Sequence, residues 1–562
     1  MAQFGTDSFG KGNLTDNADT HDVFNVPSAL ENINTYAQDQ ALQAMVQAMG
    51  GAGAEADLRA QGERTGSADW LACGFEANAH PPQLRTHDRW GHRLDWVDYH
   101  PAYHQLMRKA IAEELHASPW SRPGPGAQVR RAALYYLHCQ VEQGHGCPIT
   151  MTYAAVPALE HQPDLAAQWL PKILSAEYDP RNRHYSDKTG LTLGMAMTEK
   201  QGGSDVRANT TRAKPLSAAR PGERYQLLGH KFFMSAPNSD AFLTLAQAEG
   251  GLSCFLMPRW RAEGGKNAVL LQRLKDKLGN CSNASSEVEL RGAEAWLIGE
   301  EGRGVATILH MVALTRFDCT LASAAAMRQG VVQAIHHCVQ RRAFGKALID
   351  QPLMQNVLAD LVVESDAALA LALRLARALD HQDDPHERAL LRLGTALGKY
   401  WVCKRTPGHN YEAMECLGGS GVMNEFMTAR LYREAPINAI WEGSGNVQCL
   451  DILRALDKQP ETRQALLEEL HRAKGADSRL DRHLKELEQA LGDSEALEYR
   501  ARGLAEAMVL ALQAGLLLGH GDARVAEAFI ASRIERQHGL YGNLPKATPA
   551  RAIIDRALPM YA

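Results

Sequence analysis

Apolar positions along the 562-residue chain follow three successive patterns. From about residue 20 to 177 their spacing is mostly helical and is interrupted by prolines. A first helix through Tyr36, Leu42, Met45 and Met49 is expected to end at the glycine-rich stretch 50–53. The first third of the chain is therefore predicted to be helical.

The pattern changes between about 190 and 298. Short apolar runs there are bounded by glycine, proline, asparagine and aspartate, at 225–228, 241–245, 252–257 and 287–290. Strands at such regular spacing favour a small barrel or sandwich. From Gly304 onward long helices are expected, with breaks near Pro352, near 383–385 and at Gly418-Gly419. This order, helix-rich then strand-rich then helix-rich, predicts an α+β protein.

Charge and cysteine content narrow the classes of partner. A formal net charge of −5 gives no overall attraction to nucleic acid or anionic lipid, so a DNA contact would need a local patch. Ten cysteines without a Cys-x-x-Cys pair favour reduced thiols in a cytoplasmic protein. The set His138, Cys139, His145 and Cys147 matches no familiar ligand spacing, so no metal is expected and these residues are interpreted as structural or pocket-lining.

No targeting or membrane segment is expected. The start of the chain, through Asp19, is polar and lacks a signal-peptide pattern. No window is expected to reach the length and purity of a membrane span, and the apolar stretch 507–518 is interpreted as a packed helix.

A glycine pair follows a short apolar run at 191–197. The stretch reads Met197-Thr198-Glu199-Lys200-Gln201-Gly202-Gly203-Ser204-Asp205. Two glycines let the backbone approach a flat ligand, and the hydroxyls of Thr198 and Ser204 could bind its polar atoms. An ordinary strand-to-strand turn is the alternative for the Gly-Gly-Ser-Asp portion alone.

The longer string resembles a known family. Ala196-Met197-Thr198-Glu199 followed by Gly203-Ser204-Asp205 is similar to the flavin-contacting signature of the acyl-CoA dehydrogenases. Further matches occur in family order over roughly residues 100 to 455: Lys231-Phe232-Phe233-Met234-Ser235, Arg341-Arg342-Ala343-Phe344-Gly345, Leu417-Gly418-Gly419-Ser420-Gly421 and Ile440-Trp441-Glu442-Gly443-Ser444-Gly445-Asn446. A Rossmann-type glycine fingerprint is not found in the sequence.

A narrower resemblance extends over nearly the whole chain. The stretches 21–27, 147–152, 199–205 and 273–280 are similar to bacterial adaptive-response flavoproteins induced by DNA alkylation, which are often labelled isovaleryl-CoA dehydrogenase-like. The family fold implies an N-terminal helical domain at 1–189, a middle β-barrel at 190–298 and a C-terminal four-helix bundle at 299–455. The segment 456–562 would then be an extra helical domain, where any binding of double-stranded DNA would reside.

The resemblance implies FAD and a set of residues that would bind it. From the same subunit these are Met197, Thr198, Gly203, Ser204, Phe233, Ser235, Ser444 and Asn446. A second set of residues would reach the cofactor of a neighbouring subunit: Arg341, Phe344, Glu415, Gly418 and Gly419. Sharing of the cofactor between subunits implies a homotetramer built as a dimer of dimers. Glu415 stands where the family often has glutamine, and a carboxylate repels phosphate. For Arg341 the alternative is an ion pair within the bundle.

Glu442 is the catalytic base that the resemblance supplies. Burial beside Trp441 and a flavin would raise the pKa of Glu442, and the alternative is a capping or ion-paired glutamate near Arg433. Isovaleryl-type members place the base on another helix, where this chain has Thr315, which cannot serve. Arg316 is interpreted either as a pocket-lining charge, beside Trp441 in the substrate pocket, or as a helix-surface arginine.

The sequence leaves two candidate functions, which belong to different classes. The resemblance to the adaptive-response proteins favours an FAD-containing, DNA-associated flavoprotein with weak acyl-CoA dehydrogenase activity. The alternative is a fully active dehydrogenase for a short or branched acyl-CoA. The near balance of acidic and basic residues in 456–562 lends the DNA interpretation little support. A purely structural scaffold is disfavoured by the intact Glu442 and flavin loops.

Overall fold

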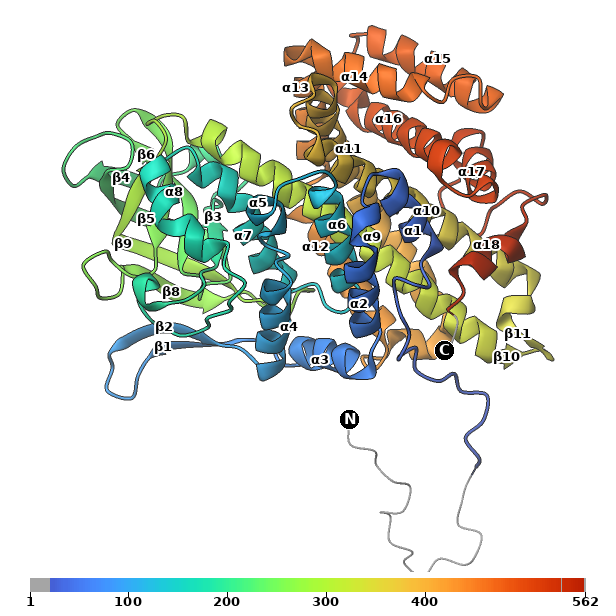
Figure 1. Ribbon diagram of the computed structural model, residues 1–562, viewed down its shortest axis with the longest axis horizontal. Coiled ribbons are helices and arrows are strands. Elements are labelled where there is room, and N and C mark those ends of the chain that lie inside the picture. The colour runs from blue at the N-terminus through green and yellow to red at the C-terminus, as the bar shows by residue number, and fades with distance from the viewer. Residues whose placement is uncertain (1–20, 537, 560–562) are drawn as a thin grey trace, which may run out of the picture.

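The computed structural model describes residues 21–536 and 538–559. The expectation for the stretch through Asp19 lies outside these residues. A β-barrel lies at one end of the molecule, the N-terminal helices and the long bundle helices lie in the middle, and the last helices lie beyond the bundle (Figure 1). This is the α+β architecture expected from the order of the sequence patterns.

The N-terminal part is mainly helical, as expected. Its helices are α1 (Gln40–Ala48), α2 (Glu55–Thr65), α3 (Ala68–Ala79), α4 (Pro101–Ala112), α5 (Ser118–Ser121), α6 (Ala127–Cys139), α7 (Gly146–Leu159) and α8 (Pro163–Ile173). Helices α6 and α7 are buried along most of their length, which is why their apolar pattern is nearly continuous rather than confined to one face.

One hairpin interrupts these helices and was not expected from the sequence. Strands β1 (Gln83–His87) and β2 (Arg93–Asp98) pair antiparallel, and the turn between them is closed by Asp88, whose carboxylate accepts from the backbone N–H groups of Trp90 and His92. Each strand has only five or six residues, too few for their alternation to stand out from the helical pattern around them. The expectation of helix here was wrong.

The middle part closes into a barrel. Its strands are β3 (Leu193–Ala196), β4 (Arg212–Pro215), β5 (Arg224–Ser235), β6 (Ala241–Ala248), β7 (Gly251–Pro258), β8 (Val269–Leu274) and β9 (Ser285–Ile298). They lie in the order β3-β6-β4-β5-β9-β7, β8 pairs with β9, and β6 also pairs with β7, so the sheet returns on itself. Tyr225, Phe242 and Phe255 are among the side chains that fill its interior.

Four helices form the bundle that follows the barrel. They are α9 (Gly304–Gln340), α10 (Pro352–Asp380), α11 (Pro385–Cys416) and α12 (Met427–Ile440). A short hairpin of β10 (Arg342–Ala343) and β11 (Lys346–Ala347) joins α9 to α10. The breaks fall where proline and glycine predicted them, because a proline fits the first helical turn but not a helix interior.

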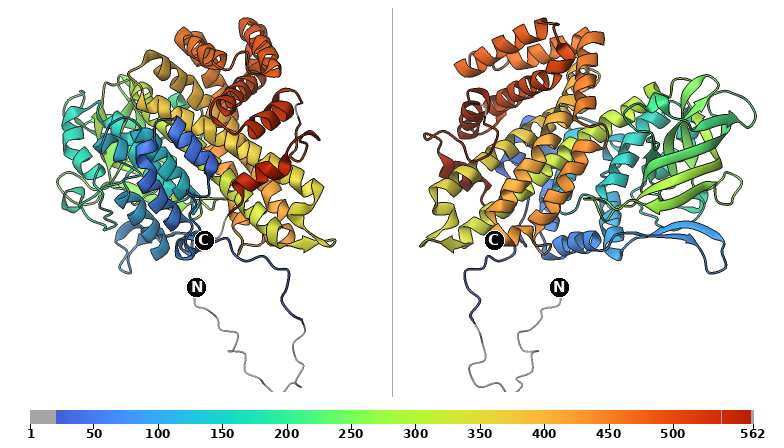
Figure 2. Two further views of the ribbon diagram at one scale, coloured as in Figure 1. Left: turned by 45° about the vertical axis from the view of Figure 1, so that its right-hand side comes forward. Right: turned by 180° about the vertical axis from the view of Figure 1, so that it is seen from behind.

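The remaining helices pack on the outer side of the bundle (Figures 1 and 2). They are α13 (Gly445–Lys458), α14 (Pro460–His471), α15 (Ser478–Gly492), α16 (Leu497–His520), α17 (Ala523–Phe529), a π-helical turn (Ile530–Ile534) and α18 (Ala550–Ala557). Helix α13 runs across the predicted boundary at 455/456. Helix α16 contacts α10, α11, α13 and α15, so this part shares its core with the bundle.

Two helices are long and apolar enough to cross a membrane by length and mean hydropathy, α9 and α16. The expectation that no segment reaches this threshold was therefore wrong. In each helix most of the apolar stretch is buried within the protein, 61% for α9 and 67% for α16. A helix that packs against neighbours on several sides is apolar around most of its circumference, which gives the same hydropathy.

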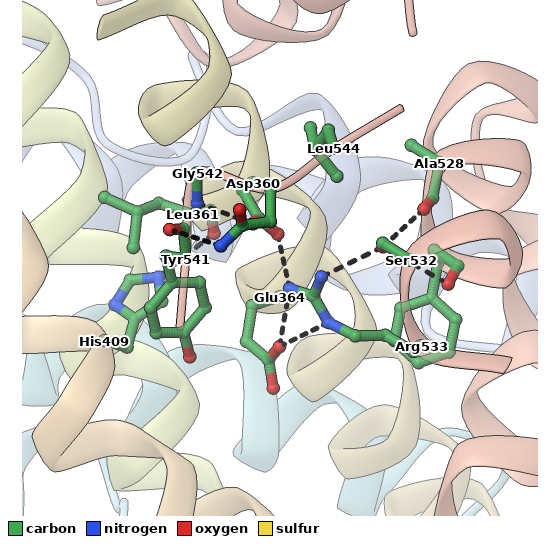
Figure 3. A network of polar contacts seen from close by, with 12 residues as sticks. Asp360, Leu361, Glu364, His409, Ala528, Ser532, Arg533, Tyr541, Gly542 and Leu544 are labelled. Atoms are coloured by element: carbon green, nitrogen blue, oxygen red, sulfur yellow. Dashed lines mark hydrogen bonds and ion pairs between the residues drawn. The ribbon is translucent and has the colours of Figure 1, made fainter. Parts of the chain in front are cut away.

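A buried charge network joins the C-terminal segment to the bundle (Figure 3). Arg533, on the π-helical turn, donates to Asp360 and Glu364 of α10, and Arg405 of α11 donates to the same Glu364 carboxylate at 2.9 and 3.0 Å. Burial acts to raise the pKa of Glu364, but the two guanidinium groups hold it down at about 2. The ring of Tyr541 lies 4.9 Å from the Arg405 guanidinium.

Replacement of Arg533 by alanine should loosen this attachment. Removing one partner of a buried ion pair leaves its carboxylates without compensation and typically costs about 3–5 kcal/mol. We expect faster amide hydrogen exchange in 523–559 of Arg533→Ala. The matched control is Arg524→Ala, which removes an arginine paired with Asp522 on the surface and should cost about 0–1 kcal/mol. Equal exchange in the two variants would contradict this role.

Candidate active site

Glu442 lies in the turn between α12 and α13. Trp441 is the C-cap residue of α12, and the next two residues have positive φ, 59° at Glu442 and 102° at Gly443. Glycine adopts this left-handed conformation freely, whereas for glutamate it costs about 1–3 kcal/mol and persists only where surrounding contacts impose it. The turn is therefore held from outside.

Three side chains hold the Glu442-Gly443 turn by bonding to its backbone carbonyl groups. Arg316 Nε donates to the Glu442 carbonyl at 3.0 Å, and Gln448 Nε2 lies 3.0 Å from both the Glu442 and the Gly443 carbonyl. Lys399 Nζ donates to the Gly443 carbonyl at 3.1 Å. Arg316 also donates to Asp451 of α13 at 2.8 Å. Arg316 is thus half-buried and bound to protein groups, rather than a free helix-surface arginine.

The carboxylate of Glu442 faces α9. Its Oε2 atom accepts a hydrogen bond from Thr315 Oγ1 at 3.0 Å. Burial raises the pKa of Glu442 above its ordinary value, and the Thr315 hydroxyl and the charges of Arg316 and Lys399 offset only part of that rise. Arg433, the ion-pair partner considered from the sequence, donates to Asn424 instead. Glu442 is therefore a half-buried carboxylate whose protonation is favoured by its surroundings.

The Trp441 indole, next to Glu442 in the chain, is oriented by a series of buried amide side chains. Its Nε1–H donates to Asn438 Oδ1 at 3.0 Å, and Asn438 Nδ2 lies 3.3 Å from Gln143 Oε1. Gln143 in turn donates to the carbonyl of Ala322 on α9 at 2.8 Å. Isolated polar residues carry no motif, which is why these contacts were not predicted from the sequence; the residues concerned are Asn438, Gln143, Gln448 and Lys399.

The loop after β3 is tied to β5, so the two predicted flavin segments lie together. The backbone N–H of Phe232 donates to the Thr198 carbonyl at 2.8 Å, and Asn209 Nδ2 donates to the Met197 carbonyl at 2.9 Å. Beneath the loop, the buried side chains of Lys231 and Glu199 pair at 2.9 Å. A Cβ atom at Gly203 would lie 2.4 Å from Thr198 Oγ1, so the loop requires glycine there. Ser204 is exposed in this loop.

The end of β5 leads from this loop toward Glu442. Phe233 is 43% exposed, and the Lys275 ammonium lies 4.7 Å from its ring centre. Ser235 Oγ lies 3.1 Å from Ser285 Oγ. The Cys147 thiol lies within reach of both the Ser235 hydroxyl and the Glu442 charge, and burial raises the pKa of this thiol to about 12.

A second group of predicted residues lies elsewhere in the chain. Arg341 directly precedes the β10–β11 hairpin and Phe344 lies in its turn, and this hairpin lies at the end of the molecule opposite the barrel (Figures 1 and 2). Arg341 donates to the Asn25 carbonyl at 2.6 Å, and the Phe344 side chain is 99% exposed. Glu415, Gly418 and Gly419 are exposed where α11 ends. One chain therefore does not bring these residues to the barrel.

Ser444 and Asn446 flank the start of α13. Ser444 is exposed and makes no side-chain cap to that helix. The Asn446 amide oxygen accepts from Arg502 of α16 at 2.9 Å, so a residue of the C-terminal helices contacts this predicted cofactor segment.

The histidines and cysteines considered for metal binding occupy buried structural positions. His145 Nδ1 bonds to Glu142 at 2.7 Å, and its other ring nitrogen contacts His138. Glu142 also accepts from Ser282 Oγ and Gly144 N, both at 2.8 Å, which links the α6–α7 turn to the barrel. All ten cysteines are free, and Cys139 and Cys147 are buried. A surface pocket of about 420 Å³ between β5, β8 and β9 lies apart from Glu442.

Comparison with known proteins identifies the family of this chain. Family models match residues 25–180 (adaptive response protein AidB N-terminal domain), 194–293 (acyl-CoA dehydrogenase middle domain) and 302–456 (acyl-CoA dehydrogenase C-terminal domain). The putative acyl-CoA dehydrogenase AidB of Escherichia coli (strain K12) is 45% identical over 93% of this chain and 96% of its own length. The chain belongs to the AidB-like acyl-CoA dehydrogenases.

Other relatives and solved structures show similarity to most of this chain. Acyl-CoA dehydrogenase family member 11 of Caenorhabditis elegans is 31% identical over 82% of this chain and 75% of its own length. The solved structure of Caenorhabditis elegans ACDH-11 in complex with C11-CoA superimposes with a TM-score of 0.81 at 26% identity, covering 95% of this chain and 93% of that one. Bd2924, in its apo form, gives 0.81 at 30% identity, over 88% and 99%.

Family membership makes the protein an FAD-dependent oxidoreductase, and its residues fit the cofactor. The backbone at Gly202 is open, because a Cβ atom there would meet nothing within 4 Å, and the Thr198 and Ser204 hydroxyls lie on the same loop. The half-exposed ring of Phe233 offers an apolar face beside that loop. These groups would hold the flavin, while the residues of the β10–β11 hairpin would need a second subunit to reach it.

Proposed function

We propose that Glu442 is the base of an acyl-CoA dehydrogenase reaction in this protein. The observation that carries the proposal is the position of a half-buried carboxylate with a raised pKa, held in a left-handed turn by Arg316 and Gln448. A base that must take a proton from carbon works best when its pKa lies near the working pH. The two nearby cations bind backbone carbonyls, so neither neutralises the carboxylate by a direct ion pair.

In this proposal FAD and the residues around Glu442 have separate roles in the reaction. Bound FAD supplies the acceptor for the hydride that leaves the β carbon of the thioester. Glu442 takes the α proton onto its carboxylate, and the product is an α,β-unsaturated thioester. Trp441, fixed by Asn438, gives the acyl chain a rigid apolar wall. Arg316 acts on the base through the backbone of the turn, since its Nε donates to the Glu442 carbonyl and its Nη1 to Asp451.

We further propose double-stranded DNA binding and a role in the alkylation response, with weak dehydrogenase activity. The support is the 45% identical relative, AidB, and the N-terminal AidB model that matches 25–180. On the C-terminal helices, Arg479 and Arg524 pair with aspartates, whereas Arg482 and Lys485 project from the exposed face of α15. These two cations are the site that we propose for phosphate contact.

A homotetramer and a cytoplasmic location complete the proposal. The exposed side chains of Phe344 and Glu415, with Gly418 and Gly419, lie apart from the barrel of their own chain, as residues that serve a neighbouring subunit's cofactor would. Ten free thiols accord with a reducing compartment.

Glu442→Gln should abolish reduction of bound FAD by acyl-CoA while leaving the FAD content of the purified protein unchanged. The amide keeps the shape of the carboxylate and its contact with Thr315 but cannot take the α proton. Flavin reduction is followed by absorbance under anaerobic conditions. The control, Glu461→Gln, removes an exposed carboxylate in the first turn of α14, and this variant should be reduced at the wild-type rate. Reduction of Glu442→Gln at the wild-type rate would exclude Glu442 as the base.

For DNA, Arg482→Glu combined with Lys485→Glu should weaken binding to duplex oligonucleotides and flatten its dependence on salt, because each lost phosphate contact reduces the counterion release by about one. The control pair, Arg212→Glu with Lys214→Glu, reverses two exposed charges on β4 of the barrel. Binding is measured by fluorescence anisotropy at several salt concentrations. Equal weakening by both pairs would leave only a general charge effect and contradict a site on α15.

A further inference from the structure

Thr315 lies on α9 directly opposite the proposed base. Its side chain is buried, with 2% of its surface exposed. Its hydroxyl oxygen has two acceptors at the same distance, Glu442 Oε2 at 3.0 Å and the carbonyl oxygen of Val312 on its own helix at 3.0 Å. The hydroxyl therefore sits between the carboxylate and the helix backbone.

A threonine hydroxyl has a single hydrogen, so it can donate to one of these oxygens at a time. An ionised carboxylate accepts a stronger, charge-assisted hydrogen bond than a neutral carbonyl does. Once Glu442 is protonated that advantage disappears, and the Val312 carbonyl, which a helical threonine commonly bonds, becomes the better acceptor. The preferred partner of the Thr315 hydrogen thus depends on whether Glu442 carries a proton.

We propose that Thr315 is a positioning residue whose hydroxyl donates to Glu442 while that carboxylate is ionised and turns to the Val312 carbonyl once Glu442 has taken the substrate proton. The inference rests on the proposed role of Glu442 and adds to it a group that stabilises the active form of the base. This hydrogen bond offsets part of the rise that burial causes in the pKa of Glu442.

The other charged or titratable groups near Glu442 act differently. Arg316 and Lys399 donate to backbone carbonyls of the turn. Burial raises the pKa of the Cys147 thiol on α7 to about 12 and that of the Cys319 thiol on α9 well above its usual range, so both stay neutral. In the part of the chain that the structure describes, Thr315 is the side chain that bonds the Glu442 carboxylate itself.

The test compares Thr315→Val, which keeps the shape but removes the hydroxyl, with Thr315→Ser, which restores it. The rate of anaerobic flavin reduction is measured against pH. The wild-type rate rises with pH as Glu442 ionises. A hydrogen bond to a charged group is worth enough that its loss should move the midpoint upward by about one pH unit. Below the midpoint Thr315→Val should then be about tenfold slower, and Thr315→Ser should return to the wild-type profile.

A matched control is Thr406→Val. Thr406 is likewise buried and bonds a helix carbonyl, that of Val402 at 2.7 Å, on α11. This variant should keep the wild-type profile. A Thr315→Val profile equal to wild type, or an equal shift in Thr406→Val, would overturn the inference. If Thr315→Val purifies without flavin, Thr315→Ala is measured against the same two outcomes.

A second readout does not depend on turnover. The protonated Glu442 gives a carboxylic-acid C=O band in infrared difference spectra between low and high pH, assigned by its absence in Glu442→Gln. Its midpoint should rise in Thr315→Val and not in Thr406→Val; an unchanged midpoint would overturn the inference. Failure of every acyl-CoA to reduce the flavin would instead contradict the proposed function, because this titration requires no substrate.

Discussion

The left-handed backbone at Glu442 is the constraint on which the site depends. The strained turn persists because Arg316, Gln448 and Lys399 bind its carbonyls, and Arg316 reaches on to Asp451 in α13. One guanidinium therefore joins three helices, α9, the end of α12 and α13, at the point where the base is presented.

The contacts of Arg316 and Lys399 with these carbonyls also explain why the Glu442 carboxylate can gain and lose a proton. Its cationic neighbours are occupied by backbone oxygens, so they hold the turn without forming an ion pair with the carboxylate. Burial can then raise the pKa of Glu442, and the Thr315 hydroxyl moderates that rise. Had Arg316 faced the carboxylate directly, the pKa of Glu442 would have fallen and the base would be weaker.

The C-terminal helices are built into this framework rather than appended to it. Arg533 and Arg405 converge on Glu364, Arg374 joins Glu387 to Glu469 of α14 at 2.6 Å each, and Arg502 reaches Asn446 beside the base. Buried guanidinium–carboxylate pairs fix geometry because each missing partner would leave an uncompensated charge. A surface on α15 would consequently be presented in a fixed orientation relative to the dehydrogenase core.

Much of the fold could be predicted from the sequence, since strand runs, prolines and glycines carry local signals. The four bundle helices break at Pro352, Pro385 and Gly418 for reasons that act within a few residues. The β1–β2 hairpin was missed because its strands are too short for a period to be read. The positions of Asn438, Gln143 and Gln448 around the base could not be predicted, because their contacts join residues up to 295 positions apart.

The most direct measurement is an anaerobic titration of the purified, flavin-loaded protein with acyl-CoA thioesters of different chain length, followed by the absorbance of the flavin band. We expect at least one thioester to bleach the band to a stoichiometric end point and to yield the α,β-unsaturated thioester, at a rate that rises with pH as Glu442 ionises. Flavin that stays oxidised with every thioester, in a protein that retains its full FAD content, would contradict the assignment of Glu442 as a working base.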